Sequence, residues 1–266
     1  MNLIYYRRLT FNFELNNCDF NKITKSIKKL SKNNKFIIYS KYNKNNILSN
    51  NIYFYIFNNK YLKINFSHIY YDAFSIFFIL DKIDLIYKNE LEEFTFDSID
   101  CKFNYIDFFK NNFNLLKNLK ISNTIKSFTN KNKKTFKILK KEVTNLSNSE
   151  LIKKILKSHH IDKFCLVINA RKIFTEFDNL LGNIIFVSDD INIKDDLREK
   201  INHYSEKKFI DIANSKPNSF MVNSYIGFSN PSFVKKFHME ITSFGNFIYI
   251  YPYNNDDEFI IYDCYM

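Results

Sequence analysis

The sequence predicts a mixed α/β fold in two halves that are joined by a basic crossover. Hydrophobic residues make up 45% of the 266 residues, which is enough apolar side chain to bury a sizeable core. Strand-like and helix-like patterns alternate in both halves, without the repeats that mark solenoids. From Phe108 to Lys141 the chain has ten lysines and no acidic residue. We therefore divide the chain into an N-terminal half (1–125), a basic crossover (126–145) and a C-terminal half (146–266); a flexible charged linker is the open alternative for the lysine run.

The N-terminal half shows segments of β-branched and aromatic residues in the alternation typical of strands. These predicted strands are Leu3–Leu15, Phe36–Ser40, Ile52–Phe57 and Tyr61–Phe66. Asp19 caps a predicted helix that runs to Leu30, and a second helical pattern extends over Phe74–Tyr87. Only three glycines occur in the chain, so Asn58-Asn59 is expected to form the turn of a hairpin, because asparagine tolerates positive φ.

The C-terminal half opens with a capping-box-like sequence, Leu146–Glu150, that predicts a helix to Ser158. A second helix is expected over Asp189–Tyr204, because acidic residues stand at its start. The strands expected in this half are Phe164–Asn169, Ile184–Val187, Phe220–Phe228, His238–Phe244, Phe247–Tyr251 and Glu258–Tyr262. Helices and strands thus mix in both halves, which is the basis of the α/β prediction.

The chain carries a net charge of +11, with 39 Lys and Arg against 28 Asp and Glu. This balance suits nucleic acid, an anionic membrane surface or a phosphate-rich small molecule as partner. Charged residues interrupt the most apolar stretch, Phe66–Ile86, and the N-terminus lacks the apolar core of a signal peptide. We therefore expect no membrane span and a cytoplasmic location. The four cysteines are far apart and form no zinc-type cluster with histidine, which predicts a reduced setting and no metal.

His68 is the candidate general base. It stands between the predicted strand Tyr61–Phe66 and the next helix, a position where a rigid scaffold holds the side chain at a cleft. Imidazole titrates near neutral pH and often takes the proton of an attacking hydroxyl or amine. Asp72 follows four residues later, but that spacing alone is not specific. A structural histidine at a strand end is the open alternative.

Two short motifs follow strands or loops in the C-terminal half. Arg171 comes directly after Asn169 and Ala170, at the end of a predicted strand. A partly buried arginine there needs a carboxylate partner, whereas an ordinary surface arginine does not. Gly182 and Asn183 precede another strand, and a glycine at that place indicates a tight turn or a close backbone approach.

A late predicted strand carries Asn223, Ser224, Tyr225 and Gly227. A glycine inside a strand weakens it and often marks where a ligand or another backbone comes close. The hydroxyl of Ser224 is suited to donate a hydrogen bond to an oxyanion, although a plain strand serine is the open alternative. The sequence has no P-loop, no glycine-rich dinucleotide fingerprint and no nucleophile elbow.

Taken in this order, the motifs resemble those of the acyl-CoA-dependent acyltransferases with the HxxxD motif. That superfamily includes chloramphenicol acetyltransferase, the plant BAHD enzymes and peptide-synthetase condensation domains. The matching residues are Ser67–Ala73, Asn169–Arg171, Leu181–Asn183 and Asn223–Gly227. The resemblance covers nearly the whole chain and depends on order and spacing. It implies two chloramphenicol-acetyltransferase-like α/β halves with a tunnel between them, which acyl-CoA enters from one face and the acceptor from the other.

The resemblance also implies a role for each matching residue. His68 matches the base that deprotonates the acceptor, and Ser224 matches a serine or asparagine near the reacting carbonyl. Asp72 and Arg171 match a structural ion pair, which here would be buried and would join the two halves. The remaining tunnel or substrate-binding positions are Asn169, Gly182, Asn183, Asn223, Tyr225 and Gly227. Ala73 departs from the family, since a glycine usually follows the motif aspartate.

We therefore expect an acyltransferase that uses acyl-CoA, with acetyl-CoA favoured, and needs no metal. The acceptor would be a small amine or hydroxyl compound, and the positive charge would also suit a nucleotide-linked amino sugar. One alternative is a basic nucleic-acid-binding module that uses the lysine run and exposed aromatics. Nucleic-acid binding would not require the motif of His68, Asp72 and Arg171. Another alternative is a degenerate relative that binds CoA without turnover.

Overall fold

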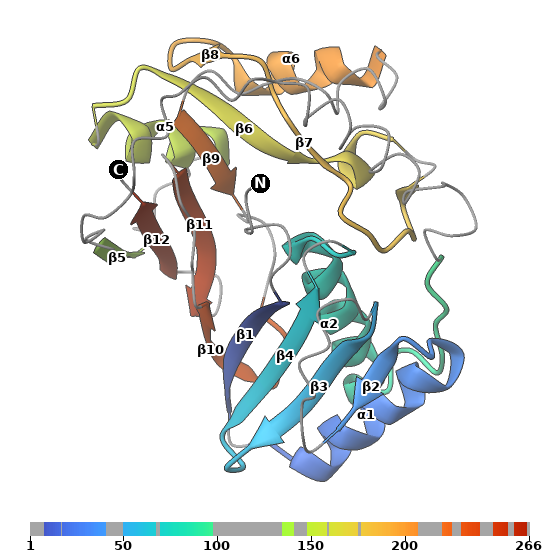
Figure 1. Cartoon of the computed structure of the whole chain (residues 1–266). Helices are drawn as coiled ribbons and strands as arrows, with labels where there is room; N and C mark the ends of the chain where they lie inside the picture. The colour runs from blue at the N-terminus through green and yellow to red at the C-terminus, as the bar shows by residue number, and fades with distance from the viewer. Residues whose placement is uncertain are drawn as a thin grey trace.

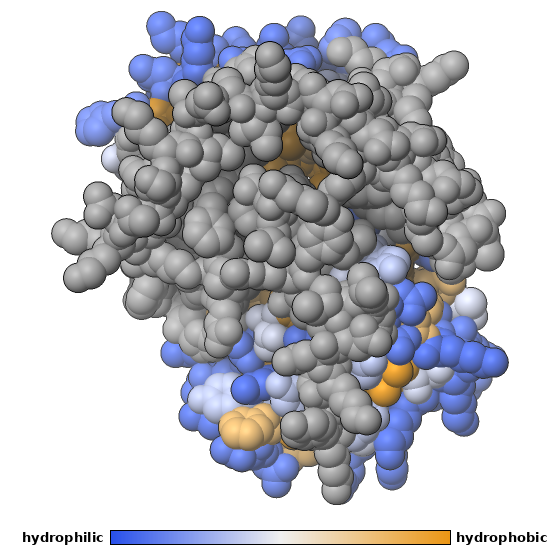
Figure 2. Space-filling view, viewed as in Figure 1, coloured by the Kyte–Doolittle hydropathy of each residue, from blue (hydrophilic) through white to orange (hydrophobic). Residues whose placement is uncertain are grey.

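The computed structural model describes residues 8–16, 18–40, 50–67, 70–97, 135–140, 148–158, 160–174, 177–206, 220–224, 230–239, 247–254 and 258–264. These segments form two β-sheets, each with helices packed on it (Figure 1). None of the described helices is long and apolar enough to cross a membrane. On the face seen in Figure 2, hydrophobic residues of the described surface appear as small separate spots among hydrophilic ones.

The first sheet has five strands in the order β10-β1-β4-β3-β2. Its strands are β1 (Arg8–Leu15), β2 (Ile37–Tyr39), β3 (Ile52–Phe57), β4 (Tyr61–Ser67) and β10 (Val234–Met239). The helices α1 (Phe20–Asn33) and α2 (Ala73–Lys88) pack on one face of this sheet (Figure 1). Because β10 pairs with β1 in antiparallel register, a strand from late in the chain completes the sheet built by the N-terminal half.

Local sequence signals explain the start of α1 and the β3–β4 turn. The Asp19 side chain accepts hydrogen bonds from the first backbone N–H groups of α1, as predicted for its cap. The helix continues to Asn33 rather than ending at Leu30. Asn58 and Asn59 both have positive φ, 52° and 47°, which confirms the predicted asparagine turn.

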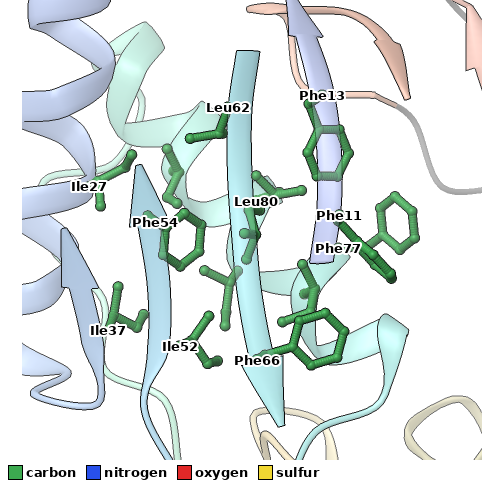
Figure 3. Packing of buried hydrophobic residues seen from close by; sticks show 14 of the residues in the cluster. Phe11, Phe13, Ile27, Ile37, Ile52, Phe54, Leu62, Phe66, Phe77 and Leu80 are labelled. Carbon is green, nitrogen blue, oxygen red and sulfur yellow. The ribbon is translucent and has the colours of Figure 1, made fainter. Parts of the chain in front are cut away.

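The core of this part lies between the five-stranded sheet and its two helices. Figure 3 shows Phe54, Leu62 and Phe66 pointing from the strands toward Phe77 and Leu80 of α2. Each of these side chains is at most 2% exposed. Alternate strand residues thus face the helices, which identifies the opposite face of the sheet as a separate surface.

The second sheet has seven strands, with the path β5-β12-β11-β9-β6-β7 and with β8 paired to β6. Its strands are β5 (Thr135–Lys140), β6 (Lys163–Asn169), β7 (Ile185–Val187), β8 (Ile191–Asn192), β9 (Phe220–Ser224), β11 (Phe247–Asn254) and β12 (Glu258–Cys264). Among the described residues of this part, the α-helices are α5 (Asn148–Ser158) and α6 (Leu197–Asn202), and the short 3₁₀ helices are η2 (Ala170–Lys172) and η4 (His203–Glu206). Ile155 and Leu156 of α5 and Leu197 of α6 belong to the core under this sheet.

Three sequence predictions are wrong in part. The helix expected over Asp189–Tyr204 begins only at Leu197, because Asp196 caps it and the residues before it form β8 and a turn. The strand expected at His238–Phe244 begins earlier, at Val234. Residues 135–140 of the predicted basic crossover form β5, which pairs with β12 at the sheet edge. The lysines of β5 obscured its alternation in the sequence.

Candidate functional site

The site is built where β4 ends and α2 begins. The backbone N–H groups of Tyr70 and Tyr71 both donate to the carbonyl of Ser67, each at 3.1 Å, so the chain turns sharply after β4. Asp72 then caps α2, and its Oδ1 accepts from the Ser75 N–H at 2.7 Å. A carboxylate is favoured at this end because it meets free N–H groups and the positive end of the helix dipole. His68, the predicted base, lies outside the described residues.

Arg171 reaches Asp72 from the other part of the molecule. Its Nη1 lies 3.1 Å from Asp72 Oδ2 and 3.4 Å from Asp72 Oδ1. The two side chains are only 7% and 1% exposed, so the predicted contact is present and buried. Asn169, the last residue of β6, orients Arg171. Its Oδ1 accepts hydrogen bonds from both the backbone N–H and Nη1 of Arg171, each at 3.1 Å.

The other guanidinium nitrogens of Arg171 also have partners. Nε donates to the carbonyl of Leu180 at 2.6 Å, and Nη2 donates to the carbonyl of Gly182 at 2.9 Å. The carboxylate of Asp72 is likewise occupied, since its Oδ2 also accepts from the N–H of Ile184 at 3.1 Å. A charged pair whose donors and acceptors are all engaged suits a positioning role better than direct contact with a substrate.

Ser75 is the member of this cluster that the sequence analysis missed. Its hydroxyl lies 2.9 Å from both Asp72 Oδ1 and the carbonyl of Gly182, and its single proton serves one of them at a time. The same oxygen accepts from Arg171 Nη2 at 2.9 Å and from the Gly182 N–H at 3.1 Å. A serine three residues after an aspartate cap was the only signal in the sequence. We refer to Asp72, Ser75, Arg171 and Gly182 as the junction.

Gly182 brings the backbone close to α2, as its glycine indicated. Its carbonyl accepts from Arg171 and also, at 3.4 Å, from the backbone N–H of Asp72. Asn183 is half-buried in the same turn. The described contacts of Gly182 and of the Asn169 side chain are with the junction, and Asn169 is itself only 6% exposed.

The remaining predicted site residues are placed only in part. Tyr225 and Gly227 lie outside the described residues, and of Asn223 and Ser224 only the backbone in β9 is described. β9 is parallel to β6, with Asn223 level with Val167. The carboxyl ends of the two strands, which carry Ser224 and Asn169, therefore lie at the same edge of the sheet. In the parts of the chain that are described, no three or more His, Cys, Asp or Glu side chains gather as a metal site.

No protein-family model matches the sequence, and no curated protein sequence matches it significantly. Solved structures do match. TRI101 of F. sporotrichioides, complexed with coenzyme A and T-2, aligns with a TM-score of 0.52 and 10% identity over 100% of this chain and 92% of that chain. Vinorine synthase aligns with a TM-score of 0.54 and 12% identity over 96% and 86%.

Polyketide synthase associated protein 5 from Mycobacterium tuberculosis aligns with a TM-score of 0.56 and 9% identity over 97% of this chain and 89% of that chain. At identities this low, these structural alignments show a shared fold and nothing finer. The chain shares the fold of these three proteins, which confirms the mixed α/β class that the sequence predicts. The tunnel expected between two halves stays a prediction.

Proposed function

We propose that this protein transfers an acyl group from acyl-CoA to the hydroxyl or amine of a small acceptor, with His68 as general base. The observation that carries the proposal is the junction. In the junction, Asp72 is fixed by its ion pair with Arg171 and by the hydrogen bond from its backbone N–H to the Gly182 carbonyl. On the other side of His68, Ser67 is the last residue of β4 and is 0% exposed. The short segment that contains His68 is thus anchored at both ends, as a residue that must meet a reacting atom requires.

The proposed chemistry needs no covalent enzyme intermediate, because a thioester is already activated. His68 takes the proton from the acceptor, whose oxygen or nitrogen attacks the thioester carbonyl carbon. The resulting oxyanion accepts hydrogen bonds from the Ser224 hydroxyl or from nearby backbone N–H groups. The tetrahedral intermediate then collapses, the carbon–sulfur bond breaks, and the CoA thiolate takes the proton back from His68.

Two observations support acyl-CoA as donor. The structure of F. sporotrichioides TRI101, which shares the fold, holds coenzyme A and T-2, a small molecule. The net charge of +11 suits the phosphates of CoA and would suit an acceptor such as a nucleotide-linked amino sugar. We propose acetyl-CoA as the donor and keep both amines and hydroxyls as acceptors.

The experiment is a thiol-release assay with acetyl-CoA and a panel of amines and alcohols. His68→Ala should lower the rate by about 10²–10⁴-fold, the usual effect of removing a general base. The matched control is His203→Ala, since the side chain of His203 is 61% exposed on η4. The control should keep the rate of the wild type. A His68→Ala rate near that of the wild type would refute the mechanism.

Calorimetry with CoA separates this proposal from its rivals. Affinity should fall from low to high salt, because lysines and arginines that meet the CoA phosphates are screened over about 8–10 Å at moderate ionic strength. Binding of CoA without transfer to any acceptor would favour a catalytically degenerate protein. Tight binding of random oligonucleotides with no binding of CoA would favour a nucleic-acid-binding module.

A further inference from the structure

Strand β4 changes character along its length. Near its start burial alternates, with Tyr61 and Lys63 half-buried and Leu62 fully buried. From Ile64 onward every residue is buried, and Asn65 and Ser67 are 5% and 0% exposed. Since alternate residues point to opposite faces, the end of β4 is covered on the face away from the helices as well as on the face toward them.

This second face is polar where it becomes buried. The strand register places Thr10 of β1 opposite Asn65 and places Asn12 opposite Lys63. Asn65 Nδ2 donates to the hydroxyl oxygen of Thr10 at 3.0 Å. A buried sheet face in a protein core is normally apolar, as the helix-covered face of the same strands is.

Two atoms of this face are buried without a hydrogen bond. Within the described part of the chain, Ser67 Oγ and Asn12 Oδ1 have no partner. Buried polar atoms are rarely left in this state, because each then loses its bonds to water without replacement. Ser67 and Asn12 lie on either side of the Asn65–Thr10 pair, and the four side chains form a row along this face. Both ends of the row therefore have an atom that can form a further hydrogen bond.

We propose that Thr10, Asn12, Asn65 and Ser67 form an acceptor wall, and that the acceptor carries several hydroxyl or amine groups, as a sugar does. The inference rests on the proposed function, because Ser67 directly precedes His68 and the reacting group must lie beside that histidine. Ser67 can donate and accept, whereas Asn12 Oδ1 only accepts and therefore requires an O–H or N–H from the ligand.

The dimensions of the wall fit a molecule larger than one small alcohol. From the level of Asn12 to Ser67 the strand advances by four residues, or about 13 Å. That is on the scale of a disaccharide or a substituted sugar. A site that hydrogen-bonds its substrate rejects analogues that lack the bonding groups, because its own polar atoms then stay unpaired.

The test compares glucosamine with cyclohexylamine, which has the same ring size and an amine but no hydroxyls. The wild type should prefer glucosamine in kcat/KM by at least about 100-fold, since unpaired buried polar groups give strong discrimination. Ser67→Ala and Asn12→Ala should each lower this preference about tenfold through the KM for glucosamine. The KM for acetyl-CoA should stay within about twofold of the wild type, because the acceptor wall does not bind the donor.

The matched control is Ser26→Ala in α1. Ser26 is also buried, at 4% exposure, but its hydroxyl donates to the carbonyl of Lys22 at 2.9 Å. This change should lower the melting temperature without changing the preference between the amines. Ser67→Ala should not lower the melting temperature, because it removes no hydrogen bond.

The outcomes separate the inference from the proposed function. Transfer that proceeds with an unchanged glucosamine preference in both wall variants would overturn the acceptor wall alone. A wild-type preference for cyclohexylamine would do the same. No transfer by the wild type to any acceptor would overturn the proposed function, and the acceptor wall with it.

Discussion

The two ends of α2 each carry a buried aspartate that binds a segment from later in the chain. Asp72 at the start is 1% exposed and pairs with Arg171, whose side chain is 7% exposed. Asp84 near the end is 8% exposed and pairs with Lys88, whose side chain is 40% exposed. One helix thus provides the same residue type in two electrostatic settings.

The partners at the second end differ in kind. Asp84 Oδ1 accepts from the N–H and the hydroxyl of Ser232, at 2.9 and 2.5 Å, and its Oδ2 lies 2.8 Å from Lys88 Nζ. Ser232 is exposed and precedes β10, so this contact holds the entry of β10 against α2. Water can replace part of these bonds, whereas it has little access to Asp72. Burial of both partners, rather than the presence of an ion pair, should therefore decide how much stability is lost when one partner is removed.

The largest expected effect is at the buried end. Asp72→Asn leaves the guanidinium of Arg171 buried without a countercharge, which should cost about 3–5 kcal/mol of unfolding free energy. Arg171→Lys should also destabilise, because an ammonium cannot reproduce the fork of hydrogen bonds. Both changes should lower the activity, since the anchor of the His68 segment is lost. Denaturant unfolding and the thiol-release assay measure these effects, and unchanged stability would show that the pair is not needed.

The second prediction concerns coupling between the same two residues. A variant with both Asp72→Asn and Arg171→Met should be less destabilised than the sum of Asp72→Asn and Arg171→Met measured singly, because no charge is then buried alone. A double-mutant cycle should give an interaction of about 0.5–3 kcal/mol between contacting residues. Additive effects would mean that each residue acts through its other hydrogen bonds.

Ser75→Ala should have an intermediate effect. It removes the hydroxyl that accepts from Arg171 Nη2 and from the Gly182 N–H, both of which are buried. Leaving the Gly182 N–H and one N–H of Arg171 Nη2 unpaired costs about 1–3 kcal/mol, or roughly 2–12 °C in melting temperature for a chain of this size. Ser26→Ala, which loses a single bond within α1, serves as the control and should cost less. A larger loss in the control would contradict the importance of Ser75.

The smallest effect is expected at the exposed end. Lys88→Ala should cost at most about 1 kcal/mol, and the cost should shrink in high salt. The hydrogen bond to Asp84 raises the pKa of the Lys88 ammonium. Its stabilisation is therefore present at neutral pH and is lost as the pH rises above about 10.4, the usual value for lysine. Unfolding measured at two salt concentrations and in alkaline buffer checks this, and a salt-independent cost above that of Ser75→Ala would contradict the comparison.

Much of the local structure could be predicted from the sequence. Asp19 and Asp72 signal helix starts because their side chains satisfy N–H groups only a few residues away. The Asn58-Asn59 turn depends on two residues that tolerate positive φ. The contact between Asp72 and Arg171 followed from the family resemblance and from the rule that a buried arginine needs a carboxylate.

The start of α6 shows the limit of local signals. Asp189, Asp195 and Asp196 are all suitable caps, and the sequence alone favoured the first of them. In the structure Asp196 caps the helix, because Ile191 and Asn192 pair with β6 and are therefore in a strand. A competition between a cap and a strand pairing is decided by a partner that lies elsewhere in the chain.

The sequence by itself therefore determined the α/β class, most helices and strands, and three of the four junction residues, Asp72, Arg171 and Gly182. Only the tertiary structure decided that β10 completes the five-stranded sheet, that β5 joins the edge of the other sheet, and that Ser75 links Asp72 to Gly182. The reason is physical: helix caps and turns form between near neighbours, whereas strand partners and buried hydrogen bonds depend on segments brought together only when the whole chain packs.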